Sequence, residues 1–512
     1  MLHVLIAVAI AIPLYEIVRA LALRKARKSL RDRARAYAEQ HGVRVDPFKF
    51  GGKALVREEL LNDLVIAQGM MKAVHAGERP TEVRERVEEY IDEIVPAFSL
   101  TAYFQVGMKL ARAAIRAVYR PLVDEESRKR ISALPDDATA VFLINHRSNF
   151  DYVVVGWALA RQVAISYAVG EWARVFPLDV LFKAFGGFFV RRGFPDPLYH
   201  TVLRRYLQLI TRRGVTQGIF PEGGLTRDGA LRSPKVGLLE ALLQLADEPG
   251  FDRELYFVPV GINYDRVLED DSLLGEKRGR EHPPTPAEKV RGALRLLWIV
   301  PWRAFVNALR VATGRLQRHG YVAVAFGEPL RWKAFAQERG FSLKGLSDEE
   351  RRGVAKEVAV ALMERIAQVI PATPVPLVAR AALELKLDAT ETDLVVRVRE
   401  LQARLLKLGV PTALGREFDV QRAARKELDE ASDRNRDLLR LEGDVLEGEV
   451  AEQIVRLGLE RLLQRQALAW SNGRVVLGPK PHAVDLLEYY SRSLAALDAP
   501  AAAPQRAHLA VP

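Results

Sequence analysis

The chain has 512 residues, enough for about two to four domains and a large buried core. Hydrophobic residues make up 49% of it and charged residues 28%, which excludes a wholly disordered chain. An excess of 11 positive charges favours anionic partners: nucleic acid, membrane headgroups or phosphorylated small molecules. Cysteine is absent, which excludes disulfides, thiolate catalysis and cysteine-ligated zinc.

An apolar run opens the chain. Residues 2–14 are too few to cross a bilayer, which takes about 20, and an extension to Ala22 includes Glu16 and Arg19. A cluster of lysines and arginines follows the run, which argues against a cleaved signal peptide. We therefore expect residues 1–24 to form a membrane anchor or interfacial helix, with the bulk of the chain on the cytoplasmic side. An amphipathic first helix of a soluble domain is the alternative.

The spacing of apolar residues divides the rest of the chain into regions. Residues 25–135 show the three- and four-residue spacing of helices. Over 136–345, short apolar runs alternate with helix-like segments, which predicts an α/β domain. The strand candidates are 138–144, 163–169, 187–191, 216–220, 255–260 and 321–326. The helix-like segments are near 152–161, 172–184, 197–212 and 236–246.

Two further regions complete the chain. Residues 346–497 turn helical again, with a short hairpin element expected at 473–477, and the Ala/Pro-rich tail 498–512 is expected to be disordered. Within the α/β region, residues 290–314 carry tryptophans among arginines. This pattern suits a membrane interface, and a core-packed helix with a basic outer face explains it nearly as well.

The segment 145–151, Asn-His-Arg-Ser-Asn-Phe-Asp, is the best candidate for catalysis because it lies between a predicted strand and a predicted helix. His146 is a candidate general base, and Asp151 can orient its imidazole and stabilise the imidazolium. The spacing alone is weak evidence, since His41 and Asp46 repeat it. That second pair follows no strand, so we prefer His146; a purely structural turn is the other interpretation.

Three more motifs follow at the ends of predicted strands. The strand at 187–191 ends in paired arginines, Arg191 and Arg192, whose planar guanidinium groups suit phosphate. Residues 220–227 hold two glycines, which let a ligand approach the backbone, and a further arginine. The segment 258–266 is an apolar strand that leads into a turn. Each motif alone could be structural, but ligands bind at the carboxyl ends of strands in α/β sheets, so their order favours one site.

Taken in order, the motifs resemble those of the glycerolipid acyltransferases, most closely the glycerol-3-phosphate and dihydroxyacetone-phosphate acyltransferase branch. The four motifs are His146-x4-Asp151, Gly187-Phe188-Phe189-Val190-Arg191-Arg192, Phe220-Pro221-Glu222-Gly223 and Val258-Pro259-Val260. The resemblance covers residues 100–380 well. It implies an α/β fold of the acyltransferase type: a mixed sheet flanked by helices, with helical N-terminal and C-terminal regions.

The resemblance implies a role for the first motif. His146 would deprotonate the acceptor hydroxyl, and Asp151 would orient His146. The family needs no metal and forms no acyl-enzyme, so Ser148 is not expected to be a nucleophile. Direct attack of an alcohol on a thioester likewise needs a base near the alcohol and donors for the oxyanion.

The other motifs would bind the substrates. The residues implied are Arg191, Arg192, Glu222, Gly223, Arg227 and Pro259. In the family, Arg191 or Arg192 together with Arg227 would hold the acceptor's phosphate, the third motif would shape that pocket, and the proline belongs to the acyl-donor side. One departure stands out, because Leu225 occupies a position where the phosphate-substrate branch usually has arginine. A cation is missing there, which leaves the acceptor's identity open.

The implied activity is transfer of a fatty acyl chain to the sn-1 hydroxyl of glycerol 3-phosphate, which gives lysophosphatidate in phospholipid biosynthesis. The donor would be acyl-CoA or an acyl carrier protein thioester, a co-substrate rather than a cofactor. Lysophosphatidate (at sn-2) and dihydroxyacetone phosphate are alternative acceptors. Membrane lipid is an expected partner, and the cytoplasmic membrane the expected location. A basic, non-catalytic protein is the other class considered, although no aromatic-interleaved motif points to nucleic acid.

Overall fold

The computed structural model describes most of the chain. The described ranges are 52–98, 107–135, 137–159, 162–170, 182–278, 318–341, 345–412 and 436–498, with the single residues Asp32, Ala36, Gln40 and Tyr103. Several predicted features lie outside the described residues: the segment 1–24, His41 with Asp46, most of 172–184, the segment 290–314 and the tail beyond residue 498.

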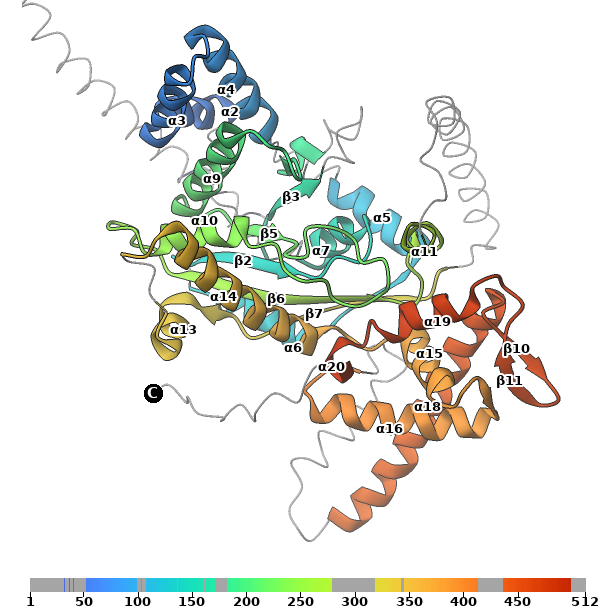
Figure 1. The fold of residues 1–512 in the computed structure, drawn as a ribbon. Helices are drawn as coiled ribbons and strands as arrows, with labels where there is room; N and C mark the ends of the chain where they lie inside the picture. Colours follow the sequence, from blue (N-terminus) through green and yellow to red (C-terminus); the bar gives the residue numbers. More distant parts are fainter. Residues whose placement is uncertain are drawn as a thin grey trace, which may run out of the picture.

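A mixed sheet of eight strands forms the centre of the described structure (Figure 1). Its strands are β1 (Arg120–Val123), β2 (Thr139–Ile144), β3 (Ser166–Gly170), β4 (Phe188–Val190), β5 (Gln217–Ile219), β6 (Leu255–Tyr264), β7 (Tyr321–Phe326) and β8 (Leu330–Arg331). The order is β1-β7-β6-β2-β5-β3-β4, with β8 also paired to β6. β2 to β6 run parallel, whereas β7 and β8 are antiparallel to β6. The carboxyl ends of five strands therefore meet at one edge.

Each of the six predicted strand segments overlaps a strand, which confirms the α/β fold. All six residues of β2 are buried, because helices cover both faces of the sheet and no polar alternation is needed. β1 was missed within the region predicted to be helical. It has only four residues, one of them Pro121, and its pattern is partly exposed, as is typical of an edge strand.

One face of the sheet is covered by helices from three parts of the chain. They are α2 (Gly52–Leu61), α3 (Leu64–His75), α4 (Pro80–Ile94), α9 (Pro197–Arg212), α10 (Gly237–Ala246), α13 (Trp332–Arg339) and α14 (Asp348–Val369). Their apolar residues share one core with Val141 and Leu143 of β2. α9 begins at Pro197 because Asp196 accepts the N–H of Leu198 at 2.8 Å, and proline has no N–H to satisfy there. The N-terminal helices thus pack against α9 and complete this layer (Figure 1).

The opposite face of the sheet contributes to a second apolar core, which it shares with another group of helices. These are α5 (Met108–Val118), α6 (Glu125–Ser132), α7 (Asp151–Leu159), α11 (Asp270–Lys277), α15 (Pro374–Glu384), α16 (Glu391–Lys407), α18 (Arg436–Gln464), α19 (Ala483–Ser491) and α20 (Ala495–Asp498). Phe142 and Ile144 of β2 belong to this core. β10 (Leu468–Ser471) and β11 (Arg474–Leu477) form the hairpin, and β9 (Asp388–Ala389) adds a third strand. The C-terminal helices therefore pack on the α/β domain.

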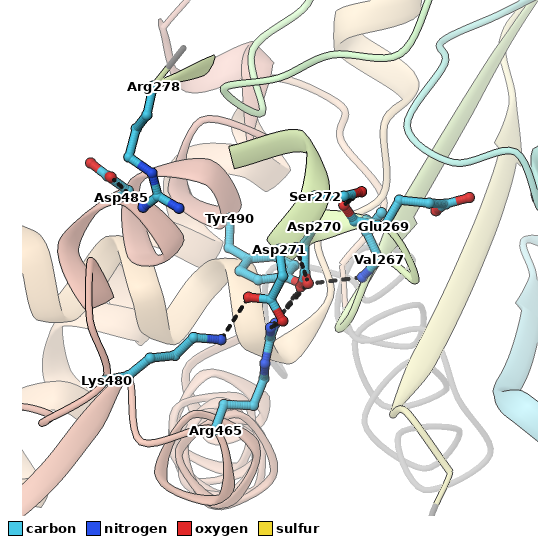
Figure 2. A network of polar contacts seen from close by, with 10 residues as sticks. All are labelled: Val267, Glu269, Asp270, Asp271, Ser272, Arg278, Arg465, Lys480, Asp485 and Tyr490. Atoms are coloured by element: carbon cyan, nitrogen blue, oxygen red, sulfur yellow. Dashed lines mark hydrogen bonds and ion pairs between the residues drawn. The ribbon is translucent and has the colours of Figure 1, made fainter. Parts of the chain in front are cut away.

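A network of polar contacts joins the C-terminal helices to α11 (Figure 2). Arg465, just after α18, pairs with the buried Asp270, and the Tyr490 hydroxyl donates to the same carboxylate. The oxygen of Tyr490 accepts the N–H of Val267 at 3.0 Å. Two outer ion pairs add to the network: Lys480 with Asp271 and Arg278 with Asp485. The network thus anchors α11, which follows directly after the turn that leaves β6.

The length and hydropathy of the described helices bear on whether any of them could span a membrane. No single helix among the described residues is both long and apolar enough to cross a bilayer. α14 and α15 reach that length and composition only together, with a bend of 95° between them. Both helices bury apolar residues against the cores described above.

Candidate active site

His146 and Asp151 lie where the chain leaves the sheet, between the end of β2 and the start of α7. Asp151 Oδ2 lies 3.0 Å from His146 Nδ1 and also accepts the backbone N–H groups of Arg147 (2.8 Å) and Ser148 (3.0 Å). Because a carboxylate oxygen can only accept, the tautomer of His146 that fits this contact has its proton on Nδ1 and its lone pair on Nε2. The two side chains therefore have the arrangement of a base and its orienting carboxylate.

Tyr264, the last residue of β6, completes the bonding of Asp151. Its hydroxyl donates to Asp151 Oδ1 at 2.5 Å, and both side chains are buried. Burial raises the pKa of the Tyr264 phenol well above its ordinary value, and the charge of Asp151 adds to this, so the phenol stays a donor. Four donors thus fix the carboxylate. Tyr264 was not among the predicted site residues, although it lies in the segment 258–266 of the fourth motif.

Glu222 holds the backbone of His146 rather than its ring. Glu222 Oε1 accepts the His146 N–H at 2.7 Å, and Oε2 accepts the Arg232 N–H at 2.9 Å. The N–H of Thr226 donates to the carbonyl of His146 at 3.2 Å. Burial raises the pKa of the Glu222 carboxyl to about 7, against the effect of the two backbone bonds. The first and third motifs are therefore one hydrogen-bonded unit.

Asn145 ties the same turn to β6. Its side-chain oxygen accepts the Ile262 N–H at 2.7 Å, and its amide nitrogen donates to the Ile262 carbonyl at 3.0 Å. This side chain bonds to the β6 backbone just where β2 ends. Asn145 was not among the predicted site residues, although a polar residue straight after a wholly buried strand was an available signal.

Ser148 is bonded away from the imidazole. Its hydroxyl donates to Glu269 Oε2 at 2.7 Å and accepts the N–H of Phe150 at 3.0 Å. Glu269 Oε1 accepts the N–H of Asn149 at 3.1 Å. Burial raises the pKa of Glu269. Ser148 thus holds the turn, and Glu269 links it to α11 and to the network of Figure 2.

A cleft of about 830 Å³ opens next to the aromatic residues that pack against the imidazole. The ring of His146 packs against Phe220, with 4.2 Å between centroids, and edge-on to Tyr152 at 5.8 Å. Both rings line the cleft, whereas His146 itself is only 1% exposed. The cationic side chains of the lining are Arg191, Arg192, Arg204, Lys235 and Arg352. Such a lining suits an anionic ligand.

A second, apolar pocket of about 200 Å³ also reaches Tyr152. Its walls are mainly apolar residues of α5, α7 and the segment before β4, among them Met108, Ala111, Gly156, Phe182 and Phe185. Tyr152 therefore lines both cavities. This pocket suits an apolar group adjoining the site.

The structure separates the three predicted arginines. Arg191 is partly buried, and its Nε lies 2.8 Å from Glu93 Oε1 of α4 in a two-pronged ion pair. Arg192 is exposed, lines the cleft, and forms no ion pair within the described ranges. Arg227 is exposed, and its Nε lies 3.0 Å from Glu276 Oε2. Arg227 is not part of the cleft lining.

Gly223 and Pro259 have different places. Gly223 lines the cleft with a φ of +63°, which favours glycine. Pro259 is buried in β6 opposite Leu143, and its carbonyl accepts the N–H of Gly327 at 2.8 Å. Because proline has no N–H, it fits where β6 changes partner from β8 to β7. It lines neither cavity. No group of three or more metal-ligating side chains lies together in the described part of the chain.

Comparisons with known proteins find similar sequences over much of the chain. Residues 126–263 match the acyltransferase family model, and residues 305–457 match the glycerol-3-phosphate acyltransferase C-terminal region. The glycerol-3-phosphate acyltransferase of Aeromonas hydrophila subsp. hydrophila is 30% identical over 366 residues, which are 70% of this chain and 42% of that protein. The enzyme of the same name from Shewanella putrefaciens is 27% identical over 370 residues, 69% of this chain and 43% of that protein.

These matches confirm the resemblance of the four motifs to the glycerol-3-phosphate acyltransferases. The chain spans less than half the length of these relatives. Among solved structures, the 1-acyl-sn-glycerophosphate (LPA) acyltransferase of Thermotoga maritima is similar with a TM-score of 0.28 and 16% identity, over 61% of this chain and 94% of that chain.

Proposed function

We propose that the chain transfers a fatty acyl group from a thioester to the sn-1 hydroxyl of glycerol 3-phosphate and so produces lysophosphatidate. The observation that carries the proposal is the His146–Asp151 pair beside a cleft lined by cations. The names of the curated relatives support glycerol 3-phosphate as the acceptor.

The chemistry is direct acyl transfer. His146 Nε2 takes the proton of the acceptor hydroxyl as that oxygen attacks the thioester carbonyl. Asp151 stabilises the imidazolium that forms. The tetrahedral intermediate then expels the thiolate, which takes up the proton from His146. This route uses no cofactor and no acyl-enzyme, consistent with a Ser148 hydroxyl that already donates to Glu269.

The two cavities suggest where each of the two substrates binds. The cationic cleft would hold the acceptor's phosphate, and the apolar pocket beyond Tyr152 would take part of the acyl chain. An enzyme that handles acyl chains works best at a bilayer, and a basic chain is attracted to anionic lipid. We therefore place the enzyme at the cytoplasmic face of the membrane, with acyl-CoA or an acyl carrier protein thioester as donor.

The test is acyl transfer by membranes that contain the wild type or His146→Ala. Glycerol 3-phosphate, dihydroxyacetone phosphate and lysophosphatidate are offered separately with each donor. We expect lysophosphatidate from glycerol 3-phosphate, lost in His146→Ala and kept in His482→Ala, an exposed histidine of the C-terminal region. Turnover with lysophosphatidate alone would move the chain to sn-2 acylation, and no His146-dependent transfer would overturn the proposal.

A further inference from the structure

Two arginine side chains meet over Gly224 of the third motif. A Cβ at Gly224 would lie 2.8 Å from Arg232 Nη1 and 3.2 Å from Arg192 Nη1. The two guanidinium groups therefore lie beside each other, on the side of Gly224 where other residues carry a side chain. Neither forms an ion pair with any carboxylate in the described ranges. Adjacent like charges repel, so the arrangement favours an anion bound between them.

Arg232 is held in place from two sides. Its backbone N–H donates to Glu222 Oε2, and its Nη1 donates to the carbonyl of Leu225 at 3.2 Å. The Leu225 side chain packs instead against the apolar core that contains Phe142 and Ile144 of β2. Position 225 therefore contributes its carbonyl to the loop, and the guanidinium comes from Arg232.

The neighbouring cations differ in whether they are neutralised. Glu93 neutralises Arg191, and Glu276 neutralises Arg227. Lys235 has no ion pair within the described ranges; its side-chain stem would lie 2.8 Å from a Cβ at Gly223, and it lines the cleft. The unneutralised charge around the glycine pair is thus that of Arg192, Arg232 and Lys235.

We propose that Arg232 and Arg192 hold the acceptor's phosphate over Gly223 and Gly224, so that Arg232 replaces the arginine missing at position 225. The identity of the acceptor rests on the proposed function, whereas the site itself needs only a phosphate group. A guanidinium bonds two phosphate oxygens at once, and the missing side chain of Gly224 leaves room for the two guanidinium groups beside the backbone. The carboxylate of Glu222 accepts the backbone N–H groups of both His146 and Arg232. It therefore fixes the position of the base relative to the phosphate-binding arginine.

The test compares Arg232→Gln and Arg232→Lys with the wild type and with Arg474→Gln. Arg474 is a control, since it pairs with Asp388 on the small C-terminal sheet. One arm measures KM and kcat for glycerol 3-phosphate. The other measures the affinity for inorganic phosphate by calorimetry, which needs no turnover. Thermal unfolding checks that each variant is folded.

We expect Arg232→Gln to raise KM and to weaken phosphate binding by about 10- to 100-fold, with kcat changed much less. Arg232→Lys should lie in between, because an ammonium keeps the charge and loses the fork. A folded Arg232→Gln with the KM and phosphate affinity of Arg474→Gln would overturn this proposal while the proposed function stands. If the wild type transfers no acyl group but loses phosphate binding with Arg232→Gln, the proposed function fails and this site stands.

Discussion

Glu222 and His146 are joined through a carboxylate and a backbone N–H, with 2.7 Å between Oε1 and the nitrogen. The turn therefore supports the base through Glu222 and lines the cleft through Gly223. Asp151 and Tyr264 fix the ring, and Glu222 fixes the main chain beneath it. The base is thus positioned from three segments that are distant in sequence.

Glu222 should make stability fall as the pH rises. Burial raises its pKa from the ordinary 4.5 to about 7, so the folded state holds a proton that the unfolded chain releases. The free energy of unfolding therefore declines across this window, by on the order of 3 kcal/mol in all. Glu222→Gln should flatten the decline, measured by urea unfolding at several pH values.

A matched variant separates this effect from a general loss of carboxylates. The pKa of Glu254 is held below its ordinary value by its bond to Arg331, so Glu254→Gln should leave the slope between pH 4.5 and 7 unchanged. An equal slope in Glu222→Gln and the wild type would mean that the folded protein does not hold this proton.

Tyr264→Phe should slow the chemical step. The change removes the donor at 2.5 Å and leaves Asp151 Oδ1 buried with one bond fewer. We expect kcat to fall by about 5- to 30-fold, with little change in KM. Tyr119→Phe is the control, because Tyr119 is also buried, packs on the Tyr264 ring and donates to the Arg266 carbonyl instead. Equal losses in both variants would show a packing effect only.

Substitution of Arg191 should lower stability, whereas substitution of Arg192 should weaken substrate binding. Arg191→Gln removes the ion pair to Glu93, which is 10% exposed, so we expect a loss of about 1–3 kcal/mol in unfolding free energy. Arg192→Gln should leave the melting temperature unchanged and raise KM for glycerol 3-phosphate. The opposite pattern, a KM effect in Arg191→Gln and a stability loss in Arg192→Gln, would reverse the assignment.

The fold was largely predictable because its central strands carry continuous apolar runs and lie between helix-like segments. β2 and β7, buried at every position, are the clearest cases. β1 was not predictable, since it is four residues long, half-exposed, and paired with a strand far along the chain. The sequence also left open whether the C-terminal helices pack on the α/β domain; the Asp270–Arg465 pair depends on contacts that no local pattern encodes.

The candidate site was predictable only as far as local motifs reach. His146, Asp151 and Glu222 each stand at a fixed place after a strand, which the sequence displays. Arg232 was missed because its importance depends on a loop that brings it back to Gly224. Likewise, nothing near Arg191 in sequence shows that Glu93 neutralises it.

The buried pair between Arg465 and Asp270 should be needed to hold the C-terminal helices on α11 (Figure 2). Arg465→Met leaves a 2% exposed carboxylate with only the Tyr490 hydroxyl and its own turn, so we expect a loss of about 3–5 kcal/mol in unfolding free energy. Adding Asp270→Asn should recover part of that loss, because the uncompensated charge is removed. Arg278→Met, at the exposed end of the network, should cost less than about 1 kcal/mol. Equal losses for Arg465→Met and Arg278→Met, measured by denaturant unfolding, would contradict a central role for the buried pair.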